Sequence, residues 1–365
     1  MKYFVYEKTP DIDEFNTVLK CRQDIRSVLV ERGYKPIHVP SQHYETDHPS
    51  SSCVVEKTKQ TISTAQNFKI WIDKLKCTRA GDIVFIQYPP LNWTLFMNVL
   101  LWLKMRRVYL ICIIHDLDSY RDSEEGKLIK NWYHFEDTHS LSFFNQIIVQ
   151  NSRMRRLLLA SGYDEKKIIN LRMFDYLTEE TDHTPVMEKN APVVITGNFD
   201  TDESKKMSFI YADEEKPGVR FNIYGTGVYE KKIISLDYEF KGNFPASHMP
   251  GMLEGSFGLV WDGNSLGNCG GNWGEYLRID NPLKFSLYLA AGMPVIIWSE
   301  AALAGFVKKY EVGFTIDSLY EIEEKIKQIS DKEYKQMREN IKPFSKAVKE
   351  GCFFAKAIER AELRL

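Results

Sequence analysis

The feature that most constrains this chain is an alternation of short, continuously apolar segments with amphipathic helical segments, which occurs twice. In the first half the apolar segments include "GDIVFIQYP", "VYLICIIHD" and "QIIVQN". The second half restarts with "PVVITGN" and continues to "SFGLVWDG" and "PVIIW". Continuous apolar strands separated by helices indicate a parallel sheet that is covered on both faces. The pattern therefore predicts an α/β protein with two Rossmann-like domains in tandem.

A polar stretch, "TEETDHTPVMEKN" at 178–190, separates the two halves and is typical of a linker. The chain has 365 residues, which is long for one hydrophobic core and agrees with two domains. We expect a first domain over 1–177, a second over 190–344, and a closing helical region over 345–365. Ligands of such sheets bind beyond the carboxyl ends of the strands, so we expect the site in a cleft between the facing domains.

Composition argues against several classes of protein. The formal net charge of -2 offers no basic excess to neutralise phosphates, so no nucleic-acid partner is expected. Six cysteines without a CxxC pair predict a reducing compartment, and neither a disulfide framework nor a zinc site. The N-terminus does not read as a signal peptide, and the longest apolar run, "LNWTLFMNVLLWL", is too short to span a bilayer. We therefore expect a cytoplasmic protein.

One lysine stands inside a segment otherwise suited to burial, "NPLKFSLYLAAGMPVIIW" at 281–298. Asn281 is a good N-cap and Pro282 suits the first helical position, which places Lys284 in the first turn of a helix that ends at Gly292. A helix N-terminus already carries partial positive charge, and an anion would relieve the two converging positive features. A bound phosphate and a lysine that snorkels from the edge of a core helix both explain Lys284.

Glycine- and asparagine-containing steps follow several strands of the second half. They are Gly197-Asn198, Gly225-Thr226-Gly227, and Gly242-Asn243 before Phe244. Glycine permits close approach of a backbone to a ligand, and asparagine offers both donors and acceptors. Ordinary turn chemistry explains any one of these steps. Their repetition, together with the Lys284 helix, favours a nucleotide site in this half.

Two nucleotide-binding fingerprints are absent from the sequence. The segment "GTGVYE" at 225–230 has two glycines at the dinucleotide-binding spacing but carries Glu230 where the third should stand. No GxxxxGK[ST] loop occurs. An NAD-dependent enzyme and a P-loop ATPase are therefore not expected.

His115 and Asp116 follow a buried strand in "CIIHDLDSYR" at 112–121, at the sheet edge that should face the cleft. Either side chain could act as general base on a hydroxyl nucleophile. The alternative is a histidine hydrogen-bonded to the backbone and an aspartate that caps the next helix, and of the two the catalytic interpretation is favoured. Asp116-Leu117-Asp118 also matches a metal-binding DxD tripeptide, but such tripeptides are common by chance and another occurs at 11–13. No metal site is predicted.

Two further segments each allow two interpretations. The segment "DGNSLGNCGGNWGE", from Asp262 to Glu275, is rich in glycine and asparagine, so we expect no helix or strand there but a mobile loop. It is either a lid that closes over substrate or a disordered insertion. Lys104, Arg106 and Arg107 end an apolar helix and fit either a contact with a membrane surface or a cationic last turn, of which the second is favoured.

The segment "YLRIDNPLKFSLYLAAGMPVIIWSEAAL" at 276–303, preceded by "GSFGLVWDG" at 255–263, resembles the donor-site region of bacterial GT-B glycosyltransferases. It resembles the β-1,6-galactofuranosyltransferases of polysaccharide clusters and is similar to the glucosyltransferases that extend GlcNAc on serine-rich-repeat adhesins. The resemblance continues through "GDIVFIQYP", "IIHD", "ITGN" and "YGTG", and so covers most of the chain. The loop "EKTPDIDEFNT" departs from the polar, glycine-containing loop of the adhesin enzymes, which leaves the acceptor open.

The resemblance implies a UDP-sugar donor bound mainly by the second domain, with no cofactor and no bound metal. Lys284 would contact the diphosphate and stabilise charge on the leaving UDP, and the helix start at Asn281 and Pro282 would add N–H groups. His115 and Asp116 would face the donor from the first domain as candidates for the catalytic base. The remaining residues implied on the nucleotide side are Tyr276, Gly197, Asn198, Tyr224, Gly225 and Phe244.

We therefore predict transfer of a hexosyl group, galactofuranosyl first and glucosyl second, to a sugar hydroxyl in polysaccharide or glycoconjugate assembly. The reaction inverts the anomeric centre if the product is a β-galactofuranoside. The first domain would carry a saccharide acceptor, lipid-linked or protein-linked, and the region 345–365 would pack back on that domain. A homo-oligomer is expected, in the cytoplasm and at the inner face of the membrane where the acceptor is lipid-linked.

One alternative from another class is a non-catalytic scaffold or chaperone with the same fold for a partner transferase. Such a protein would lose the anion site, and the intact segment around Lys284 argues against it. A nicotinamide-dependent oxidoreductase is a third class, which nothing in the sequence favours.

Overall fold

A computed structural model describes residues 1–8, 17–40, 66–91, 95–121, 127–179, 186–199, 207–212, 214–227, 233 and 235–365. The tripeptide at 11–13, Glu230 and part of the expected linker lie outside these ranges.

Six parallel strands form the sheet of the first half, in the order β2-β1-β3-β4-β5-β6. The apolar segment before His115 forms β4, which is buried over five successive residues and lies inside the sheet. The chain order reverses between β1 and β3, which is where ligands of such sheets bind. The strands are β1 Lys2–Lys8, β2 Lys35–Pro40, β3 Ile83–Tyr88, β4 Tyr109–Ile114, β5 Gln146–Val149 and β6 Ile168–Asn170.

The second half repeats this design with six parallel strands in the order β10-β9-β8-β12-β13-β14. Here the order reverses between β8 and β12. The strands are β8 Val193–Asn198, β9 Arg220–Thr226, β10 Asp237–Gly242, β12 Gly258–Val260, β13 Val295–Trp298 and β14 Gly313–Ile316, with a separate parallel pair of β7 Val186–Met187 and β11 Glu254–Gly255. Two Rossmann-like halves are confirmed.

Helices connect and cover these strands. In the first half they are α1 Thr17–Glu31, a helix over 66–75, α3 Phe96–Met105, α4 Asp118–Arg121, α5 Lys127–Ser142 and α6 Ser152–Ala160, with the 3₁₀ turn Glu165–Lys167. In the second half they are α7 Met249–Met252, α8 Gly271–Tyr276, α9 Leu283–Ala291, α10 Ala304–Tyr310, α11 Ile322–Gln328 and α12 Asp331–Lys349, with 3₁₀ turns Ser208–Tyr211 and Leu319–Glu321. The closing helix, α13 Cys352–Glu362, packs on the first half.

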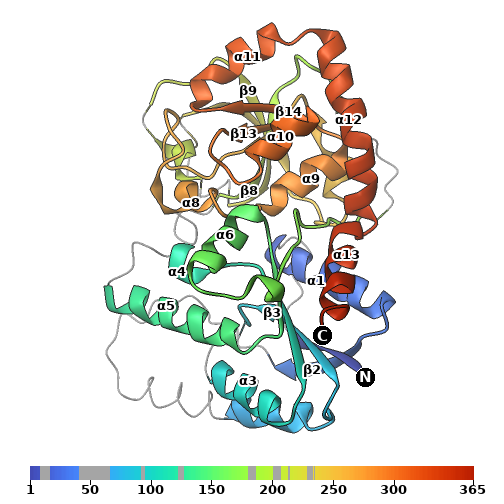
Figure 1. Ribbon diagram of the computed structural model, residues 1–365. Helices are drawn as coiled ribbons and strands as arrows, with labels where there is room; N and C mark the ends of the chain where they lie inside the picture. Colours follow the sequence, from blue (N-terminus) through green and yellow to red (C-terminus); the bar gives the residue numbers. More distant parts are fainter. Residues whose placement is uncertain are drawn as a thin grey trace.

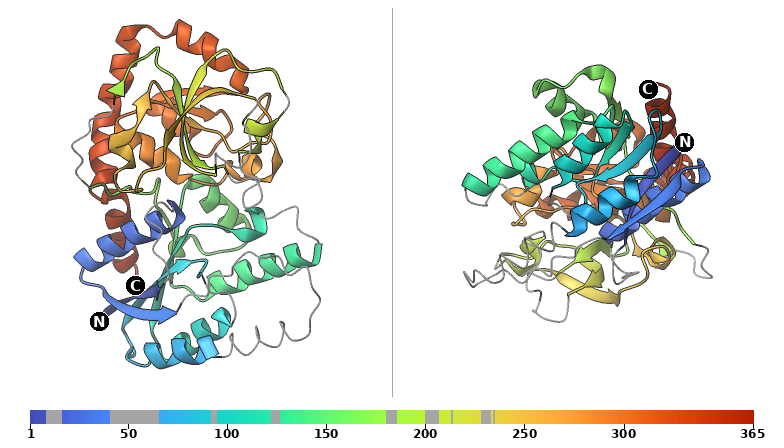
Figure 2. Two further views of the ribbon diagram at one scale, coloured as in Figure 1. Left: turned by 180° about the vertical axis from the view of Figure 1, so that it is seen from behind. Right: turned by 90° about the horizontal axis from the view of Figure 1, so that it is seen from below.

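The two halves are stacked, and the last two helices join them along one flank (Figures 1 and 2). Helix α12 runs beside the second half, and the chain turns at Gly351, with φ 68°, into α13 beside the first half. Phe354 of α13 lies in the core of the first half and meets the Phe85 ring edge-on at 5.4 Å. The position between 344 and 345, where we expected the domains to divide, falls inside α12.

One local prediction is wrong. The segment from Asp262 to Glu275, where we expect no helix, contains most of α8. It also packs closely, because a Cβ on Gly274 would stand 2.1 Å from the carbonyl oxygen of the buried Cys269. Its glycines therefore allow close backbone contacts. The polar stretch at 178–190, which we expect to be a linker, contains the short strand β7, which pairs with β11.

Candidate functional site

Lys284 lies in the first turn of α9, at the carboxyl edge of the second sheet. Its Nζ is 2.6 Å from Asp262 Oδ1 and 3.3 Å from Met207 Sδ. The Lys284 and Asp262 side chains are 9% and 1% exposed. Asp262 follows β12, one of the two strands between which the chain order reverses. A buried ion pair therefore stands at the point of this sheet where ligands are expected.

The charge of Lys284 is balanced inside the chain by Asp262. Sequence reasoning missed this partner because Asp262 precedes the lysine by 22 residues, across a glycine-rich segment. The predicted N-cap is also wrong, since Pro282 occupies the cap position without a side-chain bond and Asn281 turns to the other domain. An external anion bound at the start of α9 would therefore have to share the ammonium group of Lys284 with the buried carboxylate of Asp262.

Two predicted glycines lie together at the same edge. Gly197 of β8 pairs with Gly225 of β9, and a Cβ on Gly225, whose φ is 138°, would stand 1.8 Å from the Gly197 carbonyl oxygen. A Cβ on Gly197 would stand 2.9 Å from Met207 Sδ, the atom that Lys284 also contacts. Asn198, at the end of β8, is exposed. The structure thus places Met207 between Gly197 and Lys284, with Gly225 paired to Gly197 on the neighbouring strand.

Tyr224 and Phe244 lie differently from the expectation. Tyr224 is 1% exposed, and its hydroxyl accepts the Glu254 N–H at 2.9 Å, so its ring belongs to the core and not to the edge. Burial raises the pKa of Tyr224 to about 12. Phe244 is half-buried, with its ring centroid 6.3 Å from that of Tyr224. A lining role for Tyr224 beside the nucleotide does not fit this position.

Asn281 joins the two domains. Its Nδ2 donates to the carbonyl oxygens of Gln150 and Arg172, both at 2.9 Å, and its Oδ1 accepts from Asn151 Nδ2 at 2.9 Å. Its backbone N–H donates to Gln150 Oε1. Both amide hydrogens and the N–H are therefore used between domains, so this arrangement leaves no Asn281 donor for a diphosphate.

Tyr276 makes a second contact between the domains. Its hydroxyl accepts the Leu117 N–H at 2.9 Å, and the side chain is buried at the end of α8. Burial, followed by the nearby carboxylates Asp116 and Asp280, raises the pKa of Tyr276 well above its usual value. The hydroxyl thus stays protonated and places the carboxyl edge of β4 against α8.

His115 stands at that carboxyl edge of β4. Its Nε2 is 2.8 Å from Gln87 Oε1, and its ring is parallel to that of Phe174 with centroids 5.7 Å apart. Burial lowers the pKa of His115 well below its usual value, and the positive charges of Arg22 and Arg26 lower it further. The imidazole is therefore neutral at pH 7, as a general base must be.

Asp116, the residue after His115, interacts with a separate set of charged side chains. Its Oδ2 is 3.4 Å from Arg121 Nη1, and Arg121 Nη2 is 2.9 Å from Asp118 Oδ1. The guanidinium also lies over the Trp273 ring of α8, 5.6 Å from its centroid. Asp116 is thus held by an arginine that reaches the second domain.

Sequence reasoning missed three charged residues in this region of the first half. Glu7 is the last residue but one of β1, and its Oε2 is 3.5 Å from Nη1 of the buried Arg22. Arg26 donates to the Glu7 carbonyl oxygen at 3.1 Å. In the described part of the chain, Arg22 Nε and Nη1 have no hydrogen-bond partner. Glu7 lies near the carboxyl end of β1, so its position was open to the same inference as that of His115. The two arginines instead look like part of a solvated helix face.

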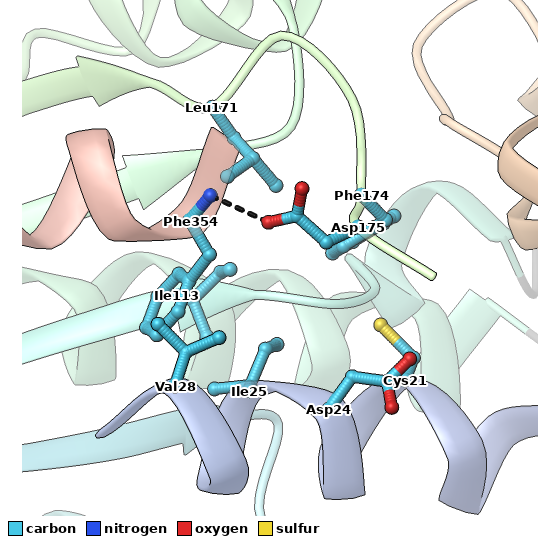
Figure 3. Close-up of a pocket in the computed structure, with 9 residues that line it drawn as sticks. All are labelled: Cys21, Asp24, Ile25, Val28, Ile113, Leu171, Phe174, Asp175 and Phe354. Atoms are coloured by element: carbon cyan, nitrogen blue, oxygen red, sulfur yellow. Dashed lines mark hydrogen bonds between the residues drawn. The ribbon is translucent and has the colours of Figure 1, made fainter. Parts of the chain in front are cut away.

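A small cavity lies in the first half, between α1, the chain after β6 and the start of α13 (Figure 3). Asp24 accepts the Leu177 N–H at 3.0 Å and pairs with Lys20, while Asp175 accepts the Phe354 N–H at 2.7 Å at the start of α13. Burial raises the pKa of Asp24 to about 6 and that of Asp175 to about 7. The lining residues are Cys21, Asp24, Ile25, Val28, Ile113, Leu171, Phe174, Asp175 and Phe354.

Among the described residues, no group of three or more histidine, cysteine, aspartate and glutamate side chains is placed to hold a metal ion. Within the same residues, no helix has the length and apolar character needed to cross a bilayer. The cations at the end of α3 have partners in the first domain, since Lys104 donates to Asn145 Oδ1 at 3.0 Å and Arg106 donates to the Thr78 carbonyl oxygen at 2.5 Å.

Two stacked Rossmann-like halves, with polar groups at the facing carboxyl edges of their sheets, define the GT-B glycosyltransferase class. The same fold occurs in a sucrose-phosphate synthase from Thermosynechococcus elongatus, with a TM-score of 0.60 over 100% of this chain and 98% of that one, at 13% identity.

The chain belongs to the glucosyltransferase 3-like family. The family's N-terminal domain matches residues 3–173 and its C-terminal domain matches 193–361. The β-1,6-galactofuranosyltransferase WbbI of Escherichia coli (strain K12) is 31% identical over 76% of this chain and 78% of that protein. Glucosyltransferase 3 of Streptococcus gordonii is 26% identical over the same shares. The protein is thus a glycosyltransferase that takes a sugar donor and a saccharide acceptor.

Proposed function

We propose that the protein transfers a hexosyl group, galactofuranosyl first and glucosyl second, from a UDP-sugar to a sugar hydroxyl in polysaccharide or glycoconjugate assembly. The observation that carries this proposal is the position of Lys284, beside Gly197 and Gly225 at the switch point of the second sheet. Nucleotides bind at such points of open α/β sheets. The order of the two sugars follows the more similar of the two relatives.

Lys284 would bind the diphosphate and offset the charge that grows on UDP as the glycosidic bond breaks. A diphosphate at the start of α9 gains from the helix dipole, and Lys284 Nζ turns from Asp262 toward it. This arrangement supplies positive charge from the chain itself, so we propose a reaction independent of a divalent metal.

His115 or Asp116 would take the proton of the acceptor hydroxyl from the side of the first domain. A base on the face opposite the leaving group gives inversion, as a β-galactofuranoside product requires. We propose that the acceptor is lipid-linked or protein-linked and that the enzyme is a cytoplasmic homo-oligomer, at the inner membrane face where the acceptor is lipid-linked.

Calorimetric titration with UDP tests the donor site. Wild type, Lys284→Ala and the control Lys308→Ala, an exposed lysine of α10, are titrated in EDTA and again with added Mg²⁺. We expect micromolar binding without metal, unchanged in the control and weakened at least tenfold, about 1.4 kcal/mol, in Lys284→Ala. UDP-galactofuranose and UDP-glucose are then compared as donors by mass spectrometry of the product. Absence of UDP binding by wild type under both conditions overturns the proposal.

One observation favours the scaffold alternative, because a carboxylate of the chain itself, that of Asp262, already pairs with Lys284. A scaffold would bind a partner transferase and leave UDP unbound. The same titration separates the two functions, because UDP binding gives a heat signal with the enzyme and none with a scaffold.

A further inference from the structure

Gln87 of β3 is a buried side chain whose orientation is determined by its two neighbours. It is 4% exposed, and its Nε2 lies 3.1 Å from the Arg22 carbonyl oxygen. A carbonyl oxygen only accepts hydrogen bonds, so the amide must present its NH₂ group to Arg22 and its Oε1 to His115. The reverse orientation would place two acceptors against each other.

This orientation also determines the form of the histidine. Gln87 Oε1 has no hydrogen to give, so the 2.8 Å contact requires a hydrogen on His115 Nε2. A neutral imidazole carries one ring hydrogen, and Nδ1 is then left with a lone pair. Phe174, with its ring at 7° to the imidazole, restrains the ring plane, and the His115 N–H donates to the Tyr88 carbonyl oxygen at 2.7 Å.

We propose that Gln87 is the positioning residue that holds His115 in the Nε2–H tautomer, so that Nδ1 is the atom that takes the proton of the acceptor hydroxyl. The inference rests on the proposed function. In the transfer step the acceptor O–H bond breaks and an Nδ1–H bond forms. The hydroxyl oxygen bonds to the anomeric carbon while the bond from that carbon to the UDP oxygen breaks. The proton stays on His115 until water takes it after product release.

Burial and nearby charges favour the neutral form of the ring. Arg22 and Arg26 of α1 oppose a positive imidazole. Two carboxylates of the same region are each paired with an arginine, Glu7 of β1 with Arg22 and Asp116 after β4 with Arg121. Asp116 is the weaker candidate for the base, because its carboxylate is paired with Arg121. A carboxylate partner would both orient a histidine and favour its positive form. The uncharged amide of Gln87 selects the tautomer of His115 without adding charge.

Nitrogen NMR of the histidines reads the tautomer directly. Protein labelled with ¹⁵N-histidine contains eight such residues, and the signals of His115 are those missing from His115→Phe. We expect a pyridine-like nitrogen at Nδ1 and a pyrrole-like nitrogen at Nε2 near pH 7. A pyridine-like Nε2 would overturn the proposal, whatever the activity of the enzyme.

Two variants of Gln87 connect the tautomer to the reaction. Gln87→Met removes the acceptor, so we expect both tautomers by NMR and a loss of about 10- to 100-fold in kcat/KM, as for other groups that orient a histidine. Gln87→Glu adds a negative charge at the same place. It should raise the pKa of His115 and shift the acid limb of the kcat/KM profile to higher pH by the same amount.

Gln146→Met is the matched control, because Gln146 is also buried in the first sheet, on β5, and its Oε1 has no partner in the described part of the chain. It should change neither the His115 signals nor the pH profile. A Gln87→Glu enzyme with a raised His115 pKa and an unmoved pH profile overturns the role of Nδ1. If no UDP-sugar is turned over, the proposed function fails, while the NMR result still decides the tautomer.

Discussion

Replacing Asp262 by asparagine should lower the stability of the protein and raise its affinity for UDP. The carboxylate is 1% exposed and lies 2.6 Å from Nζ of Lys284, which is 9% exposed. The amide oxygen of the new side chain could still accept a hydrogen bond from Nζ, but the ammonium would lose its counter-charge in a buried place. Loss of one partner of a buried pair typically costs about 3 to 5 kcal/mol in free energy of unfolding, and the remaining hydrogen bond favours the lower end.

The same substitution removes a negative charge from beside the proposed diphosphate. At about 5 Å and an effective dielectric constant of about 20, one unit charge repels another by about 3 kcal/mol. Relaxation and solvent reduce this figure, so we expect UDP to bind at least tenfold more tightly to Asp262→Asn, which is about 1.4 kcal/mol. Stability and affinity thus move in opposite directions only if Asp262 and the diphosphate share Lys284.

Chemical denaturation and calorimetric UDP titration measure the two effects on the same samples. The double variant Asp262→Asn/Lys284→Met serves as a control, because removal of both charges should restore most of the stability and abolish the gain in affinity. A parallel fall in stability and UDP affinity in Asp262→Asn would refute the reasoning, since it would show that the carboxylate supports the nucleotide site.

Three other changes have defined outcomes. Burial raises the pKa of Asp175 from 3.8 to about 7, so its contribution to folding stability falls as the pH rises from about 4 to about 7. Asp175→Asn should therefore reduce the difference between the Tm values at pH 5 and pH 8, and an unchanged difference contradicts this. Gln150→Ala removes the side-chain oxygen that accepts the Asn281 N–H across the domains. It should lower kcat/KM at least about tenfold and change UDP affinity less than about twofold, because UDP is proposed to bind the second domain; equal losses speak against it. Gly225→Ala places a Cβ against the Gly197 carbonyl oxygen and should lower the free energy of unfolding, measured with urea, by about 3 kcal/mol or more. Gly292→Ala, with φ 74° and nothing within 4 Å of its Cβ, should lower it by only about 1 to 2 kcal/mol. Similar losses in the two variants would contradict the packing argument.

The fold could be predicted from the sequence because the residues of each strand show whether that strand is buried. A run such as that of β4 is apolar over successive residues, and only a strand buried on both faces needs this pattern. Glycine-rich segments are less informative, since glycine serves both mobile loops and close packing. The chain from Asp262 to Glu275 uses it for packing around Cys269, which local composition does not reveal.

The candidate site could be predicted only in part. Neighbouring residues indicate which helix or strand carries a given side chain, but they do not indicate which distant side chain it contacts. The helix start and Gly292 place Lys284 in the first turn of α9, as the structure shows. Its partner Asp262 was visible as a residue at a strand end, but nothing local said that the two side chains meet. Asn281 shows the same limit more strongly, since a residue well suited to an N-cap is used instead to bond Gln150, 131 positions away.

Gln150 shows how the two halves of the proposed site are held in register. Its side-chain amide donates to the His115 carbonyl oxygen and accepts the Asn281 N–H, and its own carbonyl oxygen accepts from Asn281 Nδ2. One buried residue at the end of β5 therefore bonds the chain beside the proposed base and the chain three residues before Lys284. Any opening between the domains must break these bonds or move both groups together. Because a transfer reaction needs the acceptor oxygen and the anomeric carbon in a narrow range of positions, such a link keeps the proton acceptor and the diphosphate-binding lysine in one geometry.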